Sequence, residues 1–157
     1  MTKAVPEQYH AVTPNFTFRN SKQSLEFYKR AFGGEVIEEM PSLDGRGLMR
    51  ATMQIGDSVI MRGDEMPSAE CRKSAESMGS SPISLYLYVS DADAVFAQAV
   101  AAGAQVTMPL ADMFWGDRVG QVKDPFGYLW MIATHKQDLT PEQVQRGAVK
   151  FFAGGKQ

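Results

Sequence analysis

Arg50 is the residue of this chain whose type and position best suit chemistry on a small anion. It lies in a run that alternates apolar and polar residues, between Met49 and Ala51, and such alternation predicts a strand. A guanidinium that faced a cavity would hold a carboxylate or phosphonate through two parallel hydrogen bonds. The same alternation places Arg50 with Thr52 and Gln54 on a polar face, which slightly favours a solvated side chain. Both orientations are kept open.

The segment 114–118, Phe-Trp-Gly-Asp-Arg, is the most distinctive short motif. Two aromatic residues beside a glycine turn would expose apolar surface to water. We therefore expect Phe114 and Trp115 to form a lid over a cavity or a contact between two copies of the chain. Asp117 and Arg118 are expected to pair with each other or to cap the turn. Trp115 and Trp130 would suit stacking on a planar ligand, although core packing is favoured for Trp130.

The two histidines and the single cysteine are weaker candidates. His10 and His135 would form a metal pair only if two strand ends met, and no third ligand is apparent, so surface or capping roles are favoured. Cys71 lies in a polar stretch with no histidine nearby in the sequence, and an incidental surface thiol is favoured over a nucleophile. One cysteine excludes an internal disulfide and fits a reducing cytoplasm.

The elements that would position these residues repeat once along the chain. Corresponding residues, with offsets of 69, 69, 70 and 70, are Phe27 and Phe96, Gly34 and Gly103, Val36 and Val106, and Met61 and Met131. Each half reads strand, helix, strand, strand, strand. The expected strands are 10–19, 35–40, 48–55 and 58–62 in the first half, and 83–89, 105–110, 118–123 and 128–135 in the second. Both helices should pack on the outer side of the sheets.

The boundaries follow from composition and capping residues. The modules span about 8–63 and 82–136, and residues 64–81, which lack an apolar period, are expected to be a linker or a lid. Thr140, Pro141 and Gln143 form a capping box and a helix start, which predicts a C-terminal helix over 140–152. The whole domain would then cover 8–146.

Length, charge and hydropathy exclude several classes of protein. A chain of 157 residues makes one domain or two small modules with a shared core. The net charge of −2 and the scattered basic residues argue against nucleic-acid binding. No apolar run approaches the roughly 20 residues that span a bilayer, and residues 1–8 lack the apolar segment of a signal peptide. We therefore expect neither nucleic-acid nor membrane partners, and a cytoplasmic location.

Seven short motifs in order along the chain carry a family resemblance. They are 12–14 (Val-Thr-Pro), 27–33 (Phe-Tyr-Lys-Arg-Ala-Phe-Gly), 55–58 (Ile-Gly-Asp-Ser), 87–89 (Leu-Tyr-Val), 114–118, 124–127 (Asp-Pro-Phe-Gly) and 133–135 (Ala-Thr-His). Together they resemble the PhnB-like branch of the vicinal oxygen chelate superfamily, which includes glyoxalase I, bleomycin-binding proteins and extradiol dioxygenases. The resemblance implies an α+β fold, in which two tandem βαβββ modules form paired half-barrels around a cavity.

In the metal-using members of that superfamily, four side chains, usually His or Glu, reach into the cavity. The resemblance implies that Thr13, Met61, Ser84 and Met131 occupy those places here. Neutral hydroxyls and thioethers are poor ligands for hard or borderline divalent ions. We therefore expect no metal and no other cofactor, and an apolar cavity.

These observations predict a metal-free binder of a small anionic or aromatic molecule. The expected cavity residues are Thr13, Arg50, Met61, Ser84, Tyr86, Phe114, Trp115, Trp130 and Met131. A metal-dependent lyase or dioxygenase and a metal-free isomerase or transferase are kept as alternatives. The resemblance also implies a homodimer.

Overall fold

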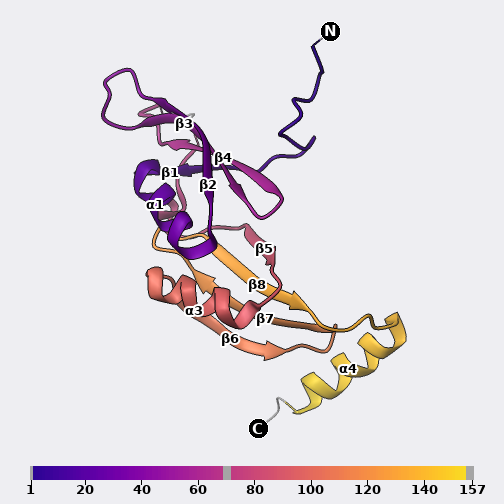
Figure 1. Cartoon of the computed structure of the whole chain (residues 1–157). Helices are drawn as coiled ribbons and strands as arrows, with labels where there is room; N and C mark the ends of the chain where they lie inside the picture. Colours follow the sequence, from indigo (N-terminus) through magenta and orange to yellow (C-terminus); the bar gives the residue numbers. More distant parts are fainter. Residues whose placement is uncertain (1, 69–71, 155–157) are drawn as a thin grey trace.

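The two halves of the chain repeat one arrangement of strands and helix (Figure 1). The computed structural model describes residues 2–68 and 72–154, so Cys71 lies outside the described residues. The first half contains β1 (Asn15–Phe18), α1 (Ser21–Phe32), β2 (Glu35–Pro41), β3 (Leu48–Ile55) and β4 (Ser58–Asp64). The second contains β5 (Ser84–Tyr88), α3 (Ala92–Ala102), β6 (Gln105–Asp112), β7 (Asp117–Lys123) and β8 (Leu129–His135). A short helix α2 (Ala75–Met78) joins the halves, and α4 (Pro141–Gly154) follows them.

Each module forms its own four-stranded sheet, with the orders β1-β4-β3-β2 and β5-β8-β7-β6. The pairs β1–β4 and β5–β8 are parallel, and the other neighbours are antiparallel. The register repeats as well, because Asn15 pairs with Met61 in the first sheet and Tyr86 pairs with Met131 in the second. The predicted α+β fold with tandem βαβββ modules is therefore confirmed.

Polar side chains cap the start of both long module helices, and a glycine follows the end of each. The Asn20 side chain accepts a hydrogen bond from a backbone N–H in the first turn of α1, and Asp91 does the same for α3. Gly33 follows α1 with φ of 66°, a left-handed conformation that glycine adopts without a steric penalty. Gly103 follows α3 in the corresponding place.

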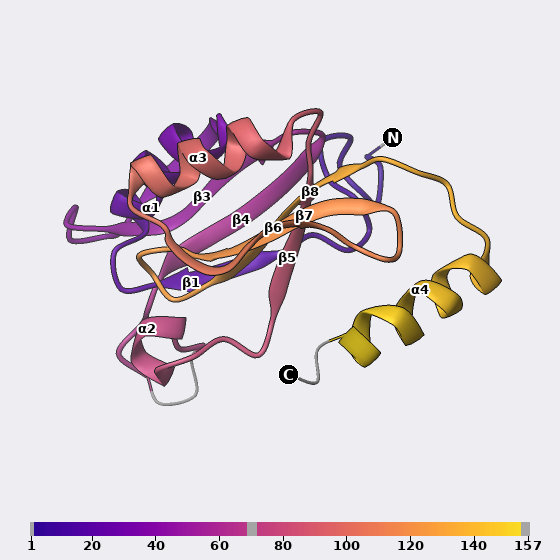
Figure 2. The same cartoon turned by 90° about the horizontal axis from the view of Figure 1, so that it is seen from below.

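Helices α1 and α3 lie side by side over the same side of the two sheets (Figure 2). They also contact each other: the Gln98 side chain of α3 donates hydrogen bonds to the carbonyls of Arg30, at 2.8 Å, and Ala31, at 3.1 Å, near the end of α1. The helix pair therefore joins the modules on the outer face. No strand of one sheet pairs with a strand of the other within the described ranges.

Beneath the helices, aromatic side chains from both modules form a shared core. Phe16 packs on Tyr128 with ring centroids 4.8 Å apart, and Phe32 packs on Trp130 at 4.6 Å. Aromatic pairs at such distances add to the energy of apolar burial. The modules are thus held together by side chains, and we expect mutations in this cluster to affect both.

The core also encloses the charged side chain of Arg62. Arg62 is 1% exposed, and its guanidinium lies 4.7 Å from the centre of the Tyr28 ring and 5.4 Å from that of Phe18. Its Nη1 donates to the Ser24 hydroxyl at 2.9 Å. Burial lowers the pKa of Arg62 to about 10, which leaves it charged at neutral pH.

Two segments differ clearly from the expected elements. Strand β1 begins at Asn15 rather than at residue 10, because Thr13 turns back to donate to the His10 carbonyl and Pro14 has no N–H for a ladder. Within 64–81 the chain forms α2, which the Ser74 hydroxyl caps by accepting from the Ser77 N–H. The C-terminal helix is present and spans Pro141–Gly154. No helix in the described ranges is both long and apolar enough to cross a bilayer.

Candidate functional site

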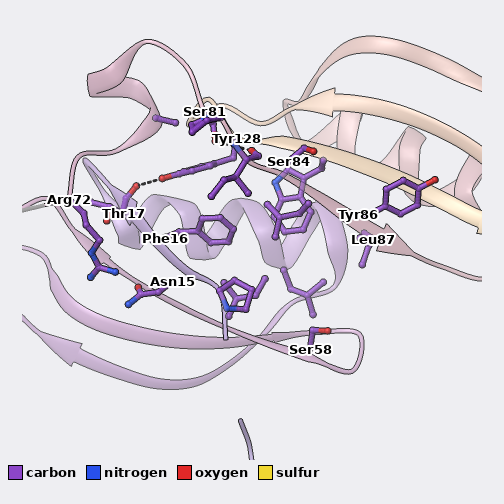
Figure 3. Close-up of a pocket in the computed structure, with 18 of the residues that line it drawn as sticks. Asn15, Phe16, Thr17, Ser58, Arg72, Ser81, Ser84, Tyr86, Leu87 and Tyr128 are labelled. Atoms are coloured by element: carbon purple, nitrogen blue, oxygen red, sulfur yellow. Dashed lines mark hydrogen bonds between the residues drawn. The ribbon is translucent and has the colours of Figure 1, made fainter. Parts of the chain in front are cut away.

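A cavity of about 890 Å³ lies where the two modules meet (Figure 3). Its walls come from β1, from the turn between β3 and β4, from residues 72–73 and α2, and from the stretch 80–88 that includes β5. Both β1 and β5 are edge strands of their sheets, so the cavity opens between two sheet edges. This volume is in the range of pockets that hold drug-sized ligands.

The interior of the cavity is formed by side chains of the shared core. Phe16, Ile60, Tyr128 and Trp130 all line it, and each is at most 8% exposed. The Tyr128 hydroxyl donates to the Thr17 carbonyl at 2.7 Å, a bond that fixes this ring of the second module against β1 of the first (Figure 3). A ligand in this cavity would therefore meet a rigid aromatic surface.

One end of the cavity carries positive charge. Arg72 and Lys73 both line it, and Figure 3 shows the Arg72 guanidinium beside the Asn15 side chain. Neither cation has an ion-pair partner within the described ranges. Hydroxyls of Ser58 and Ser84 line other parts of the cavity (Figure 3).

Tyr86 and Tyr88 of β5 line the cavity, and their hydroxyls are held by the carboxylate of Asp117, which lies outside it. Buried Asp117 accepts hydrogen bonds from the hydroxyls of Tyr86, at 3.0 Å, and Tyr88, at 2.9 Å. It also accepts from the Trp115 Nε1–H at 3.1 Å and contacts the His135 Nδ1 at 2.8 Å. The cluster holds the aromatic wall of β5 in place.

Electrostatics in this cluster follow from those contacts. Burial alone would raise the pKa of Asp117, but the hydrogen bonds from His135 and the tyrosines hold it below its usual value. Burial and the contact with Asp117 raise the pKa of Tyr86 to about 12. The hydrogen bonds to Asp117 and then to Asp138 raise the pKa of His135. Both ring nitrogens of His135 are thus engaged, which makes the imidazole a poor general base.

Of the nine residues that the sequence assigned to the cavity, Ser84, Tyr86 and Trp130 line it. Thr13 lies before β1. Met61 and Met131 alternate with buried neighbours, so they point to the sheet faces opposite the helices. There Met131 Sδ accepts a hydrogen bond from the Gln121 side chain at 3.1 Å.

Arg50 also lies outside the inter-module cavity. Its guanidinium pairs with Glu38 at 2.8 Å, with both side chains 47% exposed. It lines a second hollow of about 490 Å³ together with Met40 and Met49. This pairing is consistent with the solvated alternative for Arg50.

The aromatic turn lies outside the inter-module cavity as well. Phe114 packs against Phe151 and Phe152 of α4, with ring centroids 5.5 and 6.0 Å apart. The expected pairing of Asp117 with Arg118 is wrong, because adjacent strand residues point to opposite faces. Arg118 instead pairs with Asp93, at 2.6 Å, and with Asp112.

Sequence reasoning missed the cationic end of the cavity. Arg72 and Lys73 belong to a polar stretch without apolar periodicity, which gave no sign that they would face a cavity. Their position depends on the short α2 helix, whose signal was the serine cap at Ser74.

The resemblance implies that Thr13, Met61, Ser84 and Met131 stand at the ligand positions of the metal-using relatives. In the parallel strand pairs, the partners of Met61 and Met131 are Asn15 and Tyr86 rather than Thr13 and Ser84. With either pair of partners, the four side chains supply no carboxylate and no imidazole. No group of three or more His, Cys, Asp or Glu side chains in the described part of the chain is arranged to hold a metal.

Comparison with known proteins gives relatives over most of the chain. An uncharacterized protein of Mycobacterium bovis is 33% identical over 137 residues, which cover 86% of this chain and 90% of that protein. The crystal structure of TioX from Micromonospora sp. ML1 superposes with a TM-score of 0.64 at 23% identity, covering 80% of this chain and 98% of TioX. A Bacillus cereus PhnB protein, described as a putative 3-demethylubiquinone-9 3-methyltransferase, gives 0.62 at 19% identity, covering 80% and 99%. These two structures show the fold alone.

A family model matches residues 12–132, which include the described residues that line the cavity and all of both modules except the end of β8. The chain belongs to the Glyoxalase/Bleomycin resistance protein/Dioxygenase superfamily.

Proposed function

We propose that this protein binds a small, partly aromatic molecule in the inter-module cavity and does so without a metal ion. The observation that carries the proposal is the cavity itself: about 890 Å³, with buried aromatic side chains inside and a few polar groups around them. This combination is typical of small-molecule sites, where apolar walls supply affinity and polar groups fix orientation.

The donor set supports binding without metal. The residues for which the resemblance implies metal-ligand positions are Thr13, Met61, Ser84 and Met131, and the register partners of the two methionines are Asn15 and Tyr86. None of these side chains carries a charge or an imidazole, which a divalent ion would need. We expect protein refolded with Zn²⁺, Ni²⁺, Mn²⁺ or Fe²⁺ and then desalted to hold well under one ion per chain by elemental analysis. Stoichiometric metal that is lost in an Asn15→Ala, Met61→Ala double variant would overturn this part of the proposal and favour a metal-dependent lyase or dioxygenase.

Binding in the cavity is tested with the uncharged fluorescent probe N-phenyl-1-naphthylamine. The variant Ser84→Trp places an indole at the cavity wall and should abolish the saturable fluorescence increase. Ser90→Trp, at an exposed position just beyond β5, is the matched control and should leave it unchanged. Equal binding by both variants, or no saturable binding by the natural chain, would contradict the proposal.

The assembly that we propose is a homodimer. Helix α4 has no buried residue, and it leaves Val149, Phe151 and Phe152 between 49% and 67% exposed. The rings of Phe151 and Phe152 contact Phe114 of the same chain. A second copy of the chain would cover this apolar surface. We also propose a cytoplasmic location, which rests on the composition alone.

A further inference from the structure

The inter-module cavity is asymmetric in charge along its length. Arg72 supplies positive charge at the end beside Asn15, and Lys73, its neighbour in the sequence, also lines the cavity. The one acidic side chain among the lining residues, Asp57, is in the turn between β3 and β4 next to Ser58, whose hydroxyl donates to it at 3.0 Å. Figure 3 shows Ser58 far from Arg72, with Phe16 between them. The charge of Asp57 therefore does not neutralise the cationic end.

These cations differ from other basic side chains near the sheets. Arg50 pairs with Glu38, Arg118 pairs with Asp93 and Asp112, and buried Arg62 donates to Ser24. Arg72 and Lys73 have no such partner within the described ranges. Two unpaired cations at the end of an apolar cavity favour a ligand that brings its own negative charge.

We infer that the ligand of this cavity is an amphipathic anion, in which a carboxylate, phosphate or sulfonate contacts Arg72 and a planar apolar body lies over Phe16 and Tyr128. The planar guanidinium of Arg72 suits the two oxygens of such a group, and the Asn15 amide beside it can donate a further hydrogen bond. Lys73 adds charge without fixing geometry. The inference rests on the proposed binding function, and it replaces Arg50 with Arg72 as the group that selects an anion.

The shape of the cavity supports this orientation. Phe16 and Tyr128 lie between Arg72 and Tyr86 of β5 in Figure 3, and Trp130 and Tyr88 also line the cavity. Tyr86 and Tyr88 have their hydroxyls on Asp117, so the rings rather than the hydroxyls are presented to a ligand. An anionic group at the far end would approach the Asp117 carboxylate, which disfavours the reversed orientation.

The test compares two fluorescent probes that share an aromatic skeleton and differ in charge. 1-Anilinonaphthalene-8-sulfonate carries a sulfonate, and N-phenyl-1-naphthylamine is neutral. In the variant Arg72→Gln, the affinity for the sulfonate probe should fall about tenfold, and the affinity for the neutral probe should change less than twofold. Arg72→Lys should restore part of the affinity. Arg30→Gln on α1 is the control, because Arg30 lines neither this cavity nor the second hollow that Arg72 shares with Arg50, and it should affect the affinity for neither probe.

Salt gives a second readout, since screening weakens a contact between charges and leaves apolar contacts in place. Affinity for the sulfonate probe should fall between 50 and about 500 mM NaCl in the natural chain and be flat in Arg72→Gln. The fluorescence increase that is lost in the Ser84→Trp variant is the part of each probe's signal that comes from the cavity. If both probes bind in the cavity and Arg72→Gln changes the affinity for each by the same factor, the anion inference is wrong and the binding function stands. Loss of the cavity signal for both probes in the natural chain would overturn the binding function and the inference with it.

Discussion

Tyr28 of the first module donates its phenolic hydrogen to the carboxylate of Asp124 in the second. Both side chains are buried, at 0% and 3% exposure. Asp124 also accepts from the Trp130 Nε1–H at 3.0 Å and from the backbone N–H groups of Phe126 and Tyr128 at 2.9 Å each. A residue that the sequence marks as a turn former thus also joins the two modules.

Replacing Tyr28 with Phe removes one of the four donors from a buried carboxylate and keeps the ring in the core. Burial already raises the pKa of Asp124, so the loss of a donor should be costly. We expect the free energy of unfolding in urea to fall by about 1–3 kcal/mol. Tyr9→Phe is the control, because its hydroxyl contacts Thr52 at the edge of the hydrogen-bond range, 3.3 Å. Equal losses in the two variants would contradict the role of Tyr28.

His135 should make stability depend on pH. Hydrogen bonds to Asp117 and Asp138 raise its folded-state pKa above the ordinary value of 6.5. A raised histidine pKa contributes stability that is fully present below the unfolded-state pKa and is lost as pH rises through the folded-state pKa. Chemical unfolding from pH 5.5 upward should therefore show a decline above about pH 6.5. The variant His135→Asn should flatten that decline, and an unchanged pH profile in the variant would exclude this assignment.

Gly120 on β7 allows α3 to lie close to the second sheet. A Cβ at this position would lie 2.5 Å from a ring carbon of Phe96 and 3.1 Å from Leu110. We expect Gly120→Ala to destabilise the protein by about 1–3 kcal/mol through overpacking. Gly154→Ala, where an added Cβ would meet nothing within 4 Å, should change thermal unfolding little. A neutral Gly120→Ala would show that Phe96 can shift aside freely.

The proposed dimer predicts a particular effect of α4. Removing residues 140–157 deletes the exposed Phe151 and Phe152 and should convert a dimer at tens of micromolar into a monomer by sedimentation. The double variant Phe151→Ser, Phe152→Ser should weaken the dimer in the same direction, with far-ultraviolet circular dichroism showing that the modules remain folded. Dimers of unchanged affinity in both proteins would place the interface elsewhere on the chain.

Much of the fold was predictable from the sequence because its signals are local. The caps at Asn20 and Asp91, the glycines after each helix and the alternation along β3 lie within single elements. The offset near 70 residues then assigned the same topology to both halves.

The site was less predictable because its contacts join residues that are distant in the sequence. The alternation of residues places Met61 and Met131 on one face of each sheet. It gives no information on where the cavity lies, which is at the strand edges. There the cavity is lined by Phe16 and Trp130 from the opposite face. The donors that converge on Asp117 come from three different segments. Arg72 precedes α2, which packs beside β1, so its place at the cavity depends on contacts between segments that are distant in the sequence.

The parallel pairing of β1 with β4 has a consequence for the order of folding. Strands β2, β3 and β4 are neighbours in sequence and form by short turns, whereas Asn15 reaches Met61 only after the chain between them is already arranged. Closing such a long loop costs more entropy than closing a hairpin. The same order applies to β5 and β8 in the second module. Each module should therefore complete its edge strand late, so the walls of the inter-module cavity form after the meanders that support them.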